Sequence, residues 1–155
     1  MVGSAFLDLF AGTGGIGIEA LSRGAEQVVF VDDSRKSLDA VRHNLEQAGV
    51  SGRAQVIASK AESFLKRTGE RFDILFLDPP YSMDLAPLLA QIAGTQVLAP
   101  EGIVVAEHFK KQPSPERAGA LERYREAVYG DTVLAFYRKN IGSKESGARG
   151  QEVEP

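Results

Sequence analysis

Short apolar segments alternate with amphipathic ones along most of this chain, and that order constrains its fold more than any other feature. The apolar segments have the length of strands and the amphipathic ones the 3.6-residue period of helices. Strands are predicted at 6–10, 27–31, 55–58, 72–77 and 103–106, and helices at 16–23, 34–48, 62–67 and 85–93. Strands that alternate with helices form βαβ units, in which helices cover both faces of a parallel sheet. The sequence therefore predicts an α/β, doubly wound, mostly parallel sheet of Rossmann-like type.

The last part of the ordered sequence has a different pattern. Pro100-Glu101-Gly102 is typical of a turn, and two further strands are predicted at 124–128 and 132–137. Gly130-Asp131 lies between these two strands and indicates a hairpin. We therefore expect an antiparallel addition at one edge of the sheet, within one domain over residues 1–140. Residues 141–155 are mostly polar and are expected to be a disordered tail.

Composition excludes several kinds of protein. The 155-residue chain has no cysteine, which rules out disulfides, thiolate metal sites and a cysteine nucleophile. It has only two histidines, His43 and His108, and we expect no metal. No apolar run approaches the roughly 18 residues that a membrane span needs, so we expect a cytoplasmic protein without membrane contact. The net charge of −3 gives no overall basic footprint for nucleic acid.

A glycine-rich loop follows the first predicted strand and leads into the first helix. Gly12, Gly14 and Gly17 fit the pattern G-x-G-x-x-G, and Asp32 ends the second strand. Such glycines let the backbone approach a ligand, the helix N-terminus offers free N–H groups, and the acid can accept hydrogen bonds from ribose hydroxyls. This spacing alone leaves two cofactors open, NAD and S-adenosylmethionine.

Asp8 favours S-adenosylmethionine. An acid inside the strand, four residues before the first glycine, is unusual for a dinucleotide loop, where the strand is apolar. In methyltransferases an acid at this place supports the loop and faces the methionine ammonium, directly or through water. A buried aspartate without a cation would be costly. The alternative is a carboxylate that only caps N–H groups of the loop.

The segment Asp78-Pro79-Pro80-Tyr81 follows the fourth strand directly. Two prolines stiffen the chain and fix the direction of its polar groups. An exocyclic amine on a heterocycle is a poor nucleophile, because its lone pair is delocalised into the ring. A carboxylate and a carbonyl that accept its N–H bonds can hold the nitrogen in line with a methyl donor, and Tyr81 can stack on an unpaired base. The alternative is a strand-ending turn with a core tyrosine.

These motifs together resemble the bacterial 16S ribosomal RNA guanine-N2 methyltransferases. The matching stretches are 6–14, 17–25, 78–81, Glu107-His108 and 129–132. The resemblance implies methyl transfer from S-adenosylmethionine to a guanine N2 in the small ribosomal subunit by a monomeric enzyme. It implies cofactor contacts from Asp8, Phe10, Gly12, Gly14, Asp32, Asp33, Ala61 and Asp78. It places Asp78, Pro79 and Tyr81 at the target guanine.

The chain departs from this family at two places. Members usually carry an acid after the third strand that meets the adenine amine, and here Lys60 stands there. Backbone groups near Ala61, or Glu62, are expected to take that role. Members also carry a basic N-terminal hairpin and a helix before the first strand, whereas this sequence has only a few residues there. The resemblance therefore implies a member without the hairpin segment.

Three other functions fit parts of the pattern. One is an amino-methyltransferase acting on DNA adenine or protein glutamine, although these more often have Asn in place of Asp78. Another is an NAD-binding oxidoreductase, which the glycine spacing alone supports. The third is a cofactor-binding module without catalysis.

Overall fold

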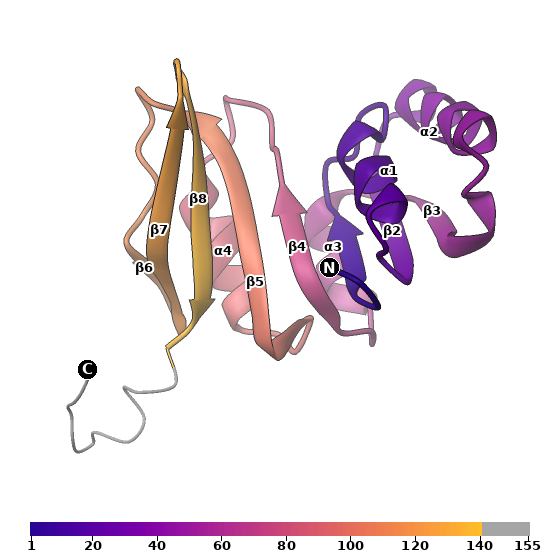
Figure 1. The fold of residues 1–155 in the computed structure, drawn as a ribbon. Coiled ribbons are helices and arrows are strands. Elements are labelled where there is room, and N and C mark those ends of the chain that lie inside the picture. Colours follow the sequence, from indigo (N-terminus) through magenta and orange to yellow (C-terminus); the bar gives the residue numbers. More distant parts are fainter. Residues whose placement is uncertain (141–155) are drawn as a thin grey trace.

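The computed structural model describes residues 1–140, which form one eight-stranded sheet with helices on both faces (Figure 1). The predicted tail at 141–155 lies outside the described residues. The strands are β1 (Ala5–Asp8), β2 (Gln27–Asp32), β3 (Ala54–Ala58), β4 (Phe72–Leu77), β5 (Leu98–Phe109), β6 (Arg117–Ala118), β7 (Leu121–Tyr129) and β8 (Thr132–Lys139). The helices are α1 (Gly15–Ser22), α2 (Arg35–Ala48), α3 (Ala61–Arg67) and α4 (Leu85–Ala93), with a 3₁₀ turn, η1, at Ser51–Arg53.

The strand order β3-β2-β1-β4-β5-β8-β7-β6 confirms the predicted doubly wound topology. Strands β1 to β5 are parallel, and β8 joins β5 antiparallel. The chain leaves β1 towards β2 and later returns to β4 on the other side of β1. This reversal is the switch point at which open α/β sheets bind ligands, outside the carboxyl ends of the strands.

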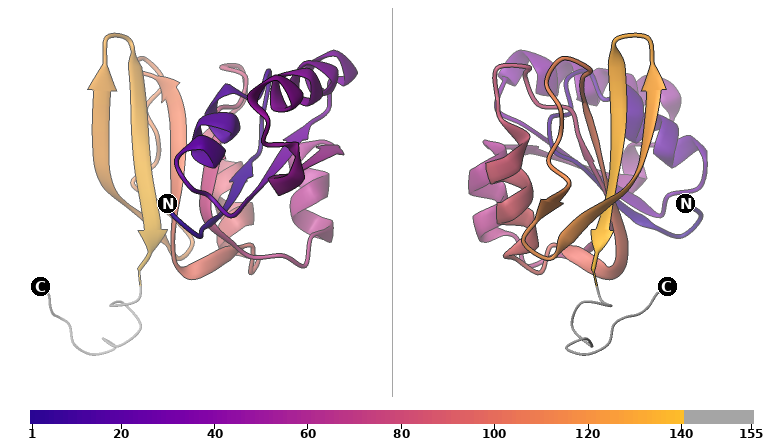
Figure 2. Two further views of the ribbon diagram at one scale, coloured as in Figure 1. Left: turned by 45° about the vertical axis from the view of Figure 1, so that its right-hand side comes forward. Right: turned by 90° about the vertical axis from the view of Figure 1, so that its left-hand side faces the viewer.

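Two apolar layers hold the helices against the sheet. Helices α1 and α2 lie over one face beside β1, β2 and β3, and α3 and α4 lie over the opposite face (Figures 1 and 2). Successive residues of a strand point alternately into the two layers. Leu7 of β1 packs on the α3–α4 side, and its neighbour Phe6 packs on the α1–α2 side. No helix within residues 1–140 is long and apolar enough to cross a membrane.

The second half of the sheet differs from the prediction in detail. The expected turn at Pro100-Glu101-Gly102 lies inside β5, where the pairing with β4 shifts register between Phe72 and Ile74. The strand therefore continues through an irregularity instead of starting at Ile103. Gly102 is enclosed there, because a Cβ atom would lie 2.9 Å from the Asp73 carbonyl oxygen.

The C-terminal hairpin is confirmed, with longer strands than predicted. Strand β7 starts at Leu121 and β8 runs to Lys139, because each strand pairs along its length with the other. Gly130 takes a positive φ of 63° in the turn between them. The sequence pattern missed the short strand β6. At the other end of the chain, β1 ends at Asp8 instead of residue 10, because the glycine-rich loop begins directly after it.

Candidate active site

The loop after β1 turns sharply at two glycines. Gly12 and Gly14 have φ angles of 58° and 88°, a region that side chains other than glycine rarely adopt. Gly14 is the N-cap of α1, so the first turn of that helix opens towards the carboxyl ends of β1 and β4. A Cβ atom on Gly12 would meet nothing within 4 Å, so the loop presents bare backbone to open space.

Asp32 ties this loop to the end of β2. Its Oδ2 accepts a hydrogen bond from the backbone N–H of Gly12 at 2.9 Å. Its Oδ1 accepts one from the N–H of Ser34, also at 2.9 Å, just before α2. Each carboxylate oxygen keeps a free lone pair, which can accept a hydrogen bond from a ligand hydroxyl.

Asp8 is a buried acid without a partner. Its side chain is 1% exposed, and neither carboxylate oxygen has a hydrogen-bond partner. Burial raises the pKa of Asp8 to about 7, and the charges of Asp78 and Asp32 add to that rise. The nearby backbone N–H of Gly17 opposes the rise in part. A cation beside Asp8 would relieve this cost.

A hollow of about 230 Å³ lies across the ends of β2 and β3. It is lined by Leu9, Phe10, Asp32, Asp33, Ser59, Lys60, Ala61, Glu62, Pro80 and Met83. Four of the predicted cofactor residues thus share one surface, together with the lysine that replaces the family's usual acid. The Ala61 side chain points into the core, since it is only 4% exposed, which leaves its backbone for the hollow.

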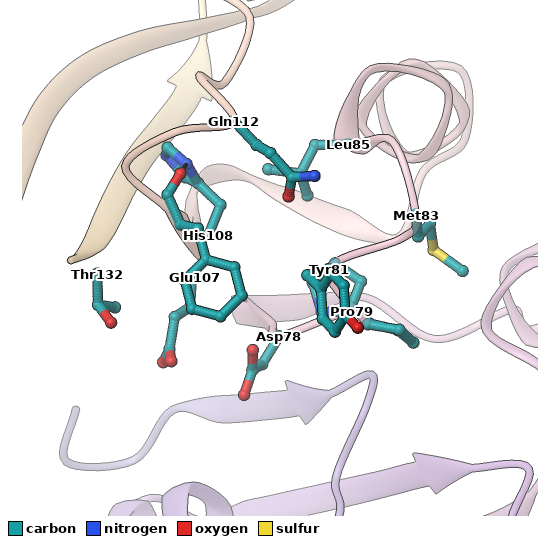
Figure 3. Close-up of a pocket in the computed structure, with 11 residues that line it drawn as sticks. Asp78, Pro79, Tyr81, Met83, Leu85, Glu107, His108, Gln112 and Thr132 are labelled. Atoms are coloured by element: carbon teal, nitrogen blue, oxygen red, sulfur yellow. Dashed lines mark hydrogen bonds between the residues drawn. The ribbon is translucent and has the colours of Figure 1, made fainter.

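A second pocket, of about 310 Å³, adjoins the hollow at Pro80 and Met83. Three of the residues around it, Asp78, Pro79 and Tyr81, belong to the predicted catalytic segment (Figure 3). The full lining is Asp78, Pro79, Pro80, Tyr81, Met83, Leu85, Glu107, His108, Phe109, Gln112 and Thr132. Tyr81 is 70% exposed, so the alternative of a core tyrosine is wrong.

Asp8, Asp78 and Glu107 lie on or directly after three neighbouring strands of the sheet, β1, β4 and β5. Phe76 pairs with Asp8 of β1, and Leu77 pairs with Ala106 of β5, so Asp78 and Glu107 leave neighbouring strands at the same level. Burial raises the pKa of both Asp78 and Glu107, and the Asp78 charge adds to the rise at Glu107. The charge of Asp78 thus acts on the carboxylates of both neighbouring strands.

Sequence reasoning named Glu107 only as part of a family match and gave it no role. It placed His108 after a strand, whereas β5 continues to Phe109 and carries both residues into the pocket. It missed Phe109, whose ring stands 5.9 Å from that of Tyr81 at a steep angle, and Thr132. The position of Glu107, one residue beyond the apolar core of β5, was the signal that could have found it.

Within residues 1–140, no three His, Cys, Asp or Glu side chains are grouped so that they could hold a metal ion. The His108 Nδ1 lies 2.9 Å from the Phe109 carbonyl oxygen, and its buried Nε2 has no partner.

The fold is that of a Rossmann-like S-adenosylmethionine-dependent methyltransferase. The chain belongs to the protein family described as "Conserved hypothetical protein 95", which matches residues 1–138.

Individual relatives agree with this assignment. The "Putative rRNA methyltransferase YlbH" of Bacillus subtilis (strain 168) is 44% identical over 137 residues, which cover 86% of this chain and 74% of the relative. The "Ribosomal RNA small subunit methyltransferase D" of Escherichia coli (strain K12) is 31% identical over 134 residues, which cover 86% of this chain and 67% of the relative. A solved structure of a conserved hypothetical protein from Streptococcus pyogenes is 29% identical, with a TM-score of 0.85, and the match covers 100% of this chain and 92% of that one.

Proposed function

We propose that this enzyme transfers a methyl group from S-adenosylmethionine to the exocyclic N2 amine of a guanine in 16S rRNA of the small ribosomal subunit. We further propose that it acts in the cytoplasm as a monomer. The observation that carries the proposal is the position of Asp78, between the buried Asp8 and an open pocket with an exposed tyrosine. Two relatives named as rRNA methyltransferases, one of them for the small subunit, support RNA as the substrate.

The residues around the first hollow fit the cofactor. Asp8 has a buried carboxylate without a partner, which suits the methionine ammonium, directly or through water. Gly12 leaves open space beside the loop for the methionine portion, Gly14 turns the loop with a positive φ, and Asp32 has free lone pairs for the ribose hydroxyls. When bound, the cofactor supplies an electrophilic methyl group on a sulfonium.

The adenine end of the cofactor would lie in the same hollow. Phe10 offers an apolar surface there and Asp33 stands beside Asp32 at the rim. Lys60 is exposed and cannot accept a hydrogen bond from the adenine amine. We therefore assign that role to the backbone near Ala61 or to the carboxylate of Glu62, both of which line the hollow.

The second pocket would hold the acceptor base. The carboxylate of Asp78 and a nearby backbone carbonyl, fixed by Pro79, accept the two N–H bonds of the amine. This holds its nitrogen in line with the methyl group and lets the nitrogen become pyramidal. The exposed ring of Tyr81 stacks on the base once it is unpaired. Orientation of this kind can account for several kcal/mol of a reaction barrier, roughly 7 or more in favourable systems.

Two experiments test the proposal. Calorimetry with S-adenosylhomocysteine and with NAD should show binding of the former alone, and NAD binding alone would indicate an oxidoreductase. Labelled methyl transfer should then be measured with unmodified small-subunit particles, DNA and bulk protein as separate substrates. We expect label in the rRNA. Label in DNA or protein but not in rRNA would contradict the substrate assignment.

A further inference from the structure

Among the polar side chains that line the second pocket, which would hold the acceptor base, three come from neighbouring strands or a strand end. Asp78 follows β4, Glu107 lies in β5 and Thr132 begins β8. The pairing of Leu77 with Ala106 places Asp78 beside Glu107. The pairing of Phe109 with Thr132 places Thr132 on the far side of β5, close to the same end of the sheet. The three side chains therefore follow the strand order β4, β5, β8.

All three project towards the same face of the sheet. Residues Leu77 and Ala106 pack in the α3–α4 layer, so the next residues along each strand, Asp78 and Glu107, point to the opposite face. Figure 3 shows the two carboxylates side by side, with the Thr132 hydroxyl beyond Glu107. The pocket thus presents an acceptor, a second acceptor and a hydroxyl that can donate, in that order.

We infer that Glu107 and Thr132 determine the specificity of the site for guanine by reading the Watson–Crick edge beside the reacting amine. This inference rests on the proposed function. That edge of guanine presents the N2 amine, the N1–H and the O6 carbonyl in sequence: two donors and then an acceptor. With the amine on Asp78, the N1–H donates to Glu107 and O6 accepts from the Thr132 hydroxyl.

The same three side chains reject adenine and cytosine, the other bases with an exocyclic amine. Adenine and cytosine each carry an exocyclic amine next to a ring nitrogen that has a lone pair and no hydrogen. With either amine on Asp78, that lone pair would face the Glu107 carboxylate, so acceptor would oppose acceptor. A site built to accept a donor rejects an analogue that lacks it, because the half-buried acceptor is left unpaired.

The walls of the pocket suit a flat base. The rings of Tyr81 and Phe109 are 70% and 48% exposed, and their centroids lie 5.9 Å apart at an interplanar angle of 61°. One ring can therefore stack on the face of a base while the other meets its edge. Glu107 is half-buried below these rings, where water competes less for its hydrogen bond.

The test uses 2-aminopurine, which keeps the reacting amine but lacks both the N1–H and O6. The labelled nucleotide is first mapped with the wild-type enzyme. Small-subunit particles are then assembled from RNA that carries guanine or 2-aminopurine at that position, and kcat/KM is measured on both. The variants are Glu107→Gln and Thr132→Val, with the exposed Glu101→Gln of the same strand as the matched control.

Glu107→Gln should lose about 5- to 10-fold on guanine, because its amide oxygen can still accept the N1–H but without the negative charge. It should gain on 2-aminopurine, because its amide can donate to N1. Thr132→Val should lose about 2- to 10-fold on guanine and nothing on 2-aminopurine. Glu101→Gln should match the wild type on both.

An unchanged preference for guanine over 2-aminopurine in Glu107→Gln would overturn the inference, as would equal losses on both bases. Binding of S-adenosylhomocysteine to each variant shows that it is folded, since neither residue lines the cofactor hollow. If the wild-type enzyme labels no guanine, the proposed function itself fails and this inference falls with it. If the wild-type enzyme labels guanine and Glu107→Gln keeps the wild-type preference for guanine, only this inference is overturned and the proposed function stands.

Discussion

The Oδ2 of Asp32 accepts a hydrogen bond from the backbone N–H of Gly12 at 2.9 Å, although twenty residues separate them in the chain. Gly12 lies in the loop between β1 and α1 with a φ of 58°, and this hydrogen bond ties the loop to the end of β2. The same carboxylate holds Ser34, the N-cap of α2, through its other oxygen. One side chain thus ties the glycine-rich loop and the start of α2 to the end of β2.

Replacing Asp32 by Asn should disturb these hydrogen bonds while keeping a side chain of the same size. The amide has one acceptor oxygen for two backbone donors, so one N–H loses its partner. We expect a loss of about 1–3 kcal/mol in the free energy of unfolding and at least tenfold weaker binding of S-adenosylhomocysteine. Chemical denaturation and calorimetry measure these, with the exposed Asp33→Asn as a control for stability. Equal stability of the two variants would contradict the bridging role.

Asp8 should make the ligand-free protein less stable as the pH rises. Its pKa is about 7 in the folded protein against an ordinary 3.8. Between about pH 4 and pH 7 the folded protein therefore retains a proton that the unfolded chain has lost, and the free energy of unfolding falls across that window. At about 1.4 kcal/mol per pH unit the total approaches about 4 kcal/mol.

Asp8→Asn should therefore be more stable than the wild type at pH 8, by an amount that shrinks towards pH 4. Denaturation of both proteins across this range measures the difference. Since other acids titrate equally in both, their contributions cancel. A variant that is less stable at pH 8 would show that Asp8 already has a stabilising partner.

The same substitution should have the opposite effect on cofactor binding. A cation beside Asp8 favours its ionised form, so below pH 7 the side chain must release a proton before it can pair. Affinity of the wild type for S-adenosylhomocysteine should fall by up to about tenfold per pH unit below 7. Asp8→Asn should bind weakly at every pH and lack this dependence. Calorimetry at pH 5.5, 6.5 and 7.5 measures the affinity of both proteins. If the affinities of the wild type and Asp8→Asn change in parallel with pH, Asp8 does not bind the ammonium group.

Gly17 should matter for packing and not for ligand contact. A Cβ atom there would lie 2.3 Å from the Cε2 of Phe30, a side chain fixed in the core. Gly17→Ala should cost about 1–3 kcal/mol of stability through overpacking. Gly15→Ala, in the same helix but with nothing within 4 Å, should be neutral or slightly stabilising. Similar melting temperatures for the two variants would contradict the close approach of α1 to β2.

These residues show what the sequence could predict. Alternating periodicity was sufficient for the parallel sheet, because each strand and helix carries its own pattern of apolar residues. The loop at Gly12 and Gly14 and the segment at Asp78 were found because their chemistry is local in sequence. Each of them follows a predicted strand, and the structure brings them together because parallel strands end at one edge of the sheet.

Other features depended on contacts between distant segments. The packing of Gly17 on Phe30 depends on how α1 lies on β2, and the place of Thr132 opposite Phe109 depends on strand register; no local pattern gives either. Pro100-Glu101-Gly102 resembled a turn because its residues favour one, but pairing with β4 at Leu98 and again from Ile103 keeps the chain in one irregular strand. The short strand β6 has only two residues and no period to detect.

The central claim is that Asp78 holds a guanine amine for methyl transfer. The most direct measurement is the identity of the methylated nucleoside, obtained by digesting rRNA from unmodified small-subunit particles after reaction with the enzyme. The wild type should yield N2-methylguanosine, and Asp78→Ala should yield at least 100-fold less while still binding S-adenosylhomocysteine. Methylated adenosine in place of N2-methylguanosine, or full activity of Asp78→Ala, would contradict the account.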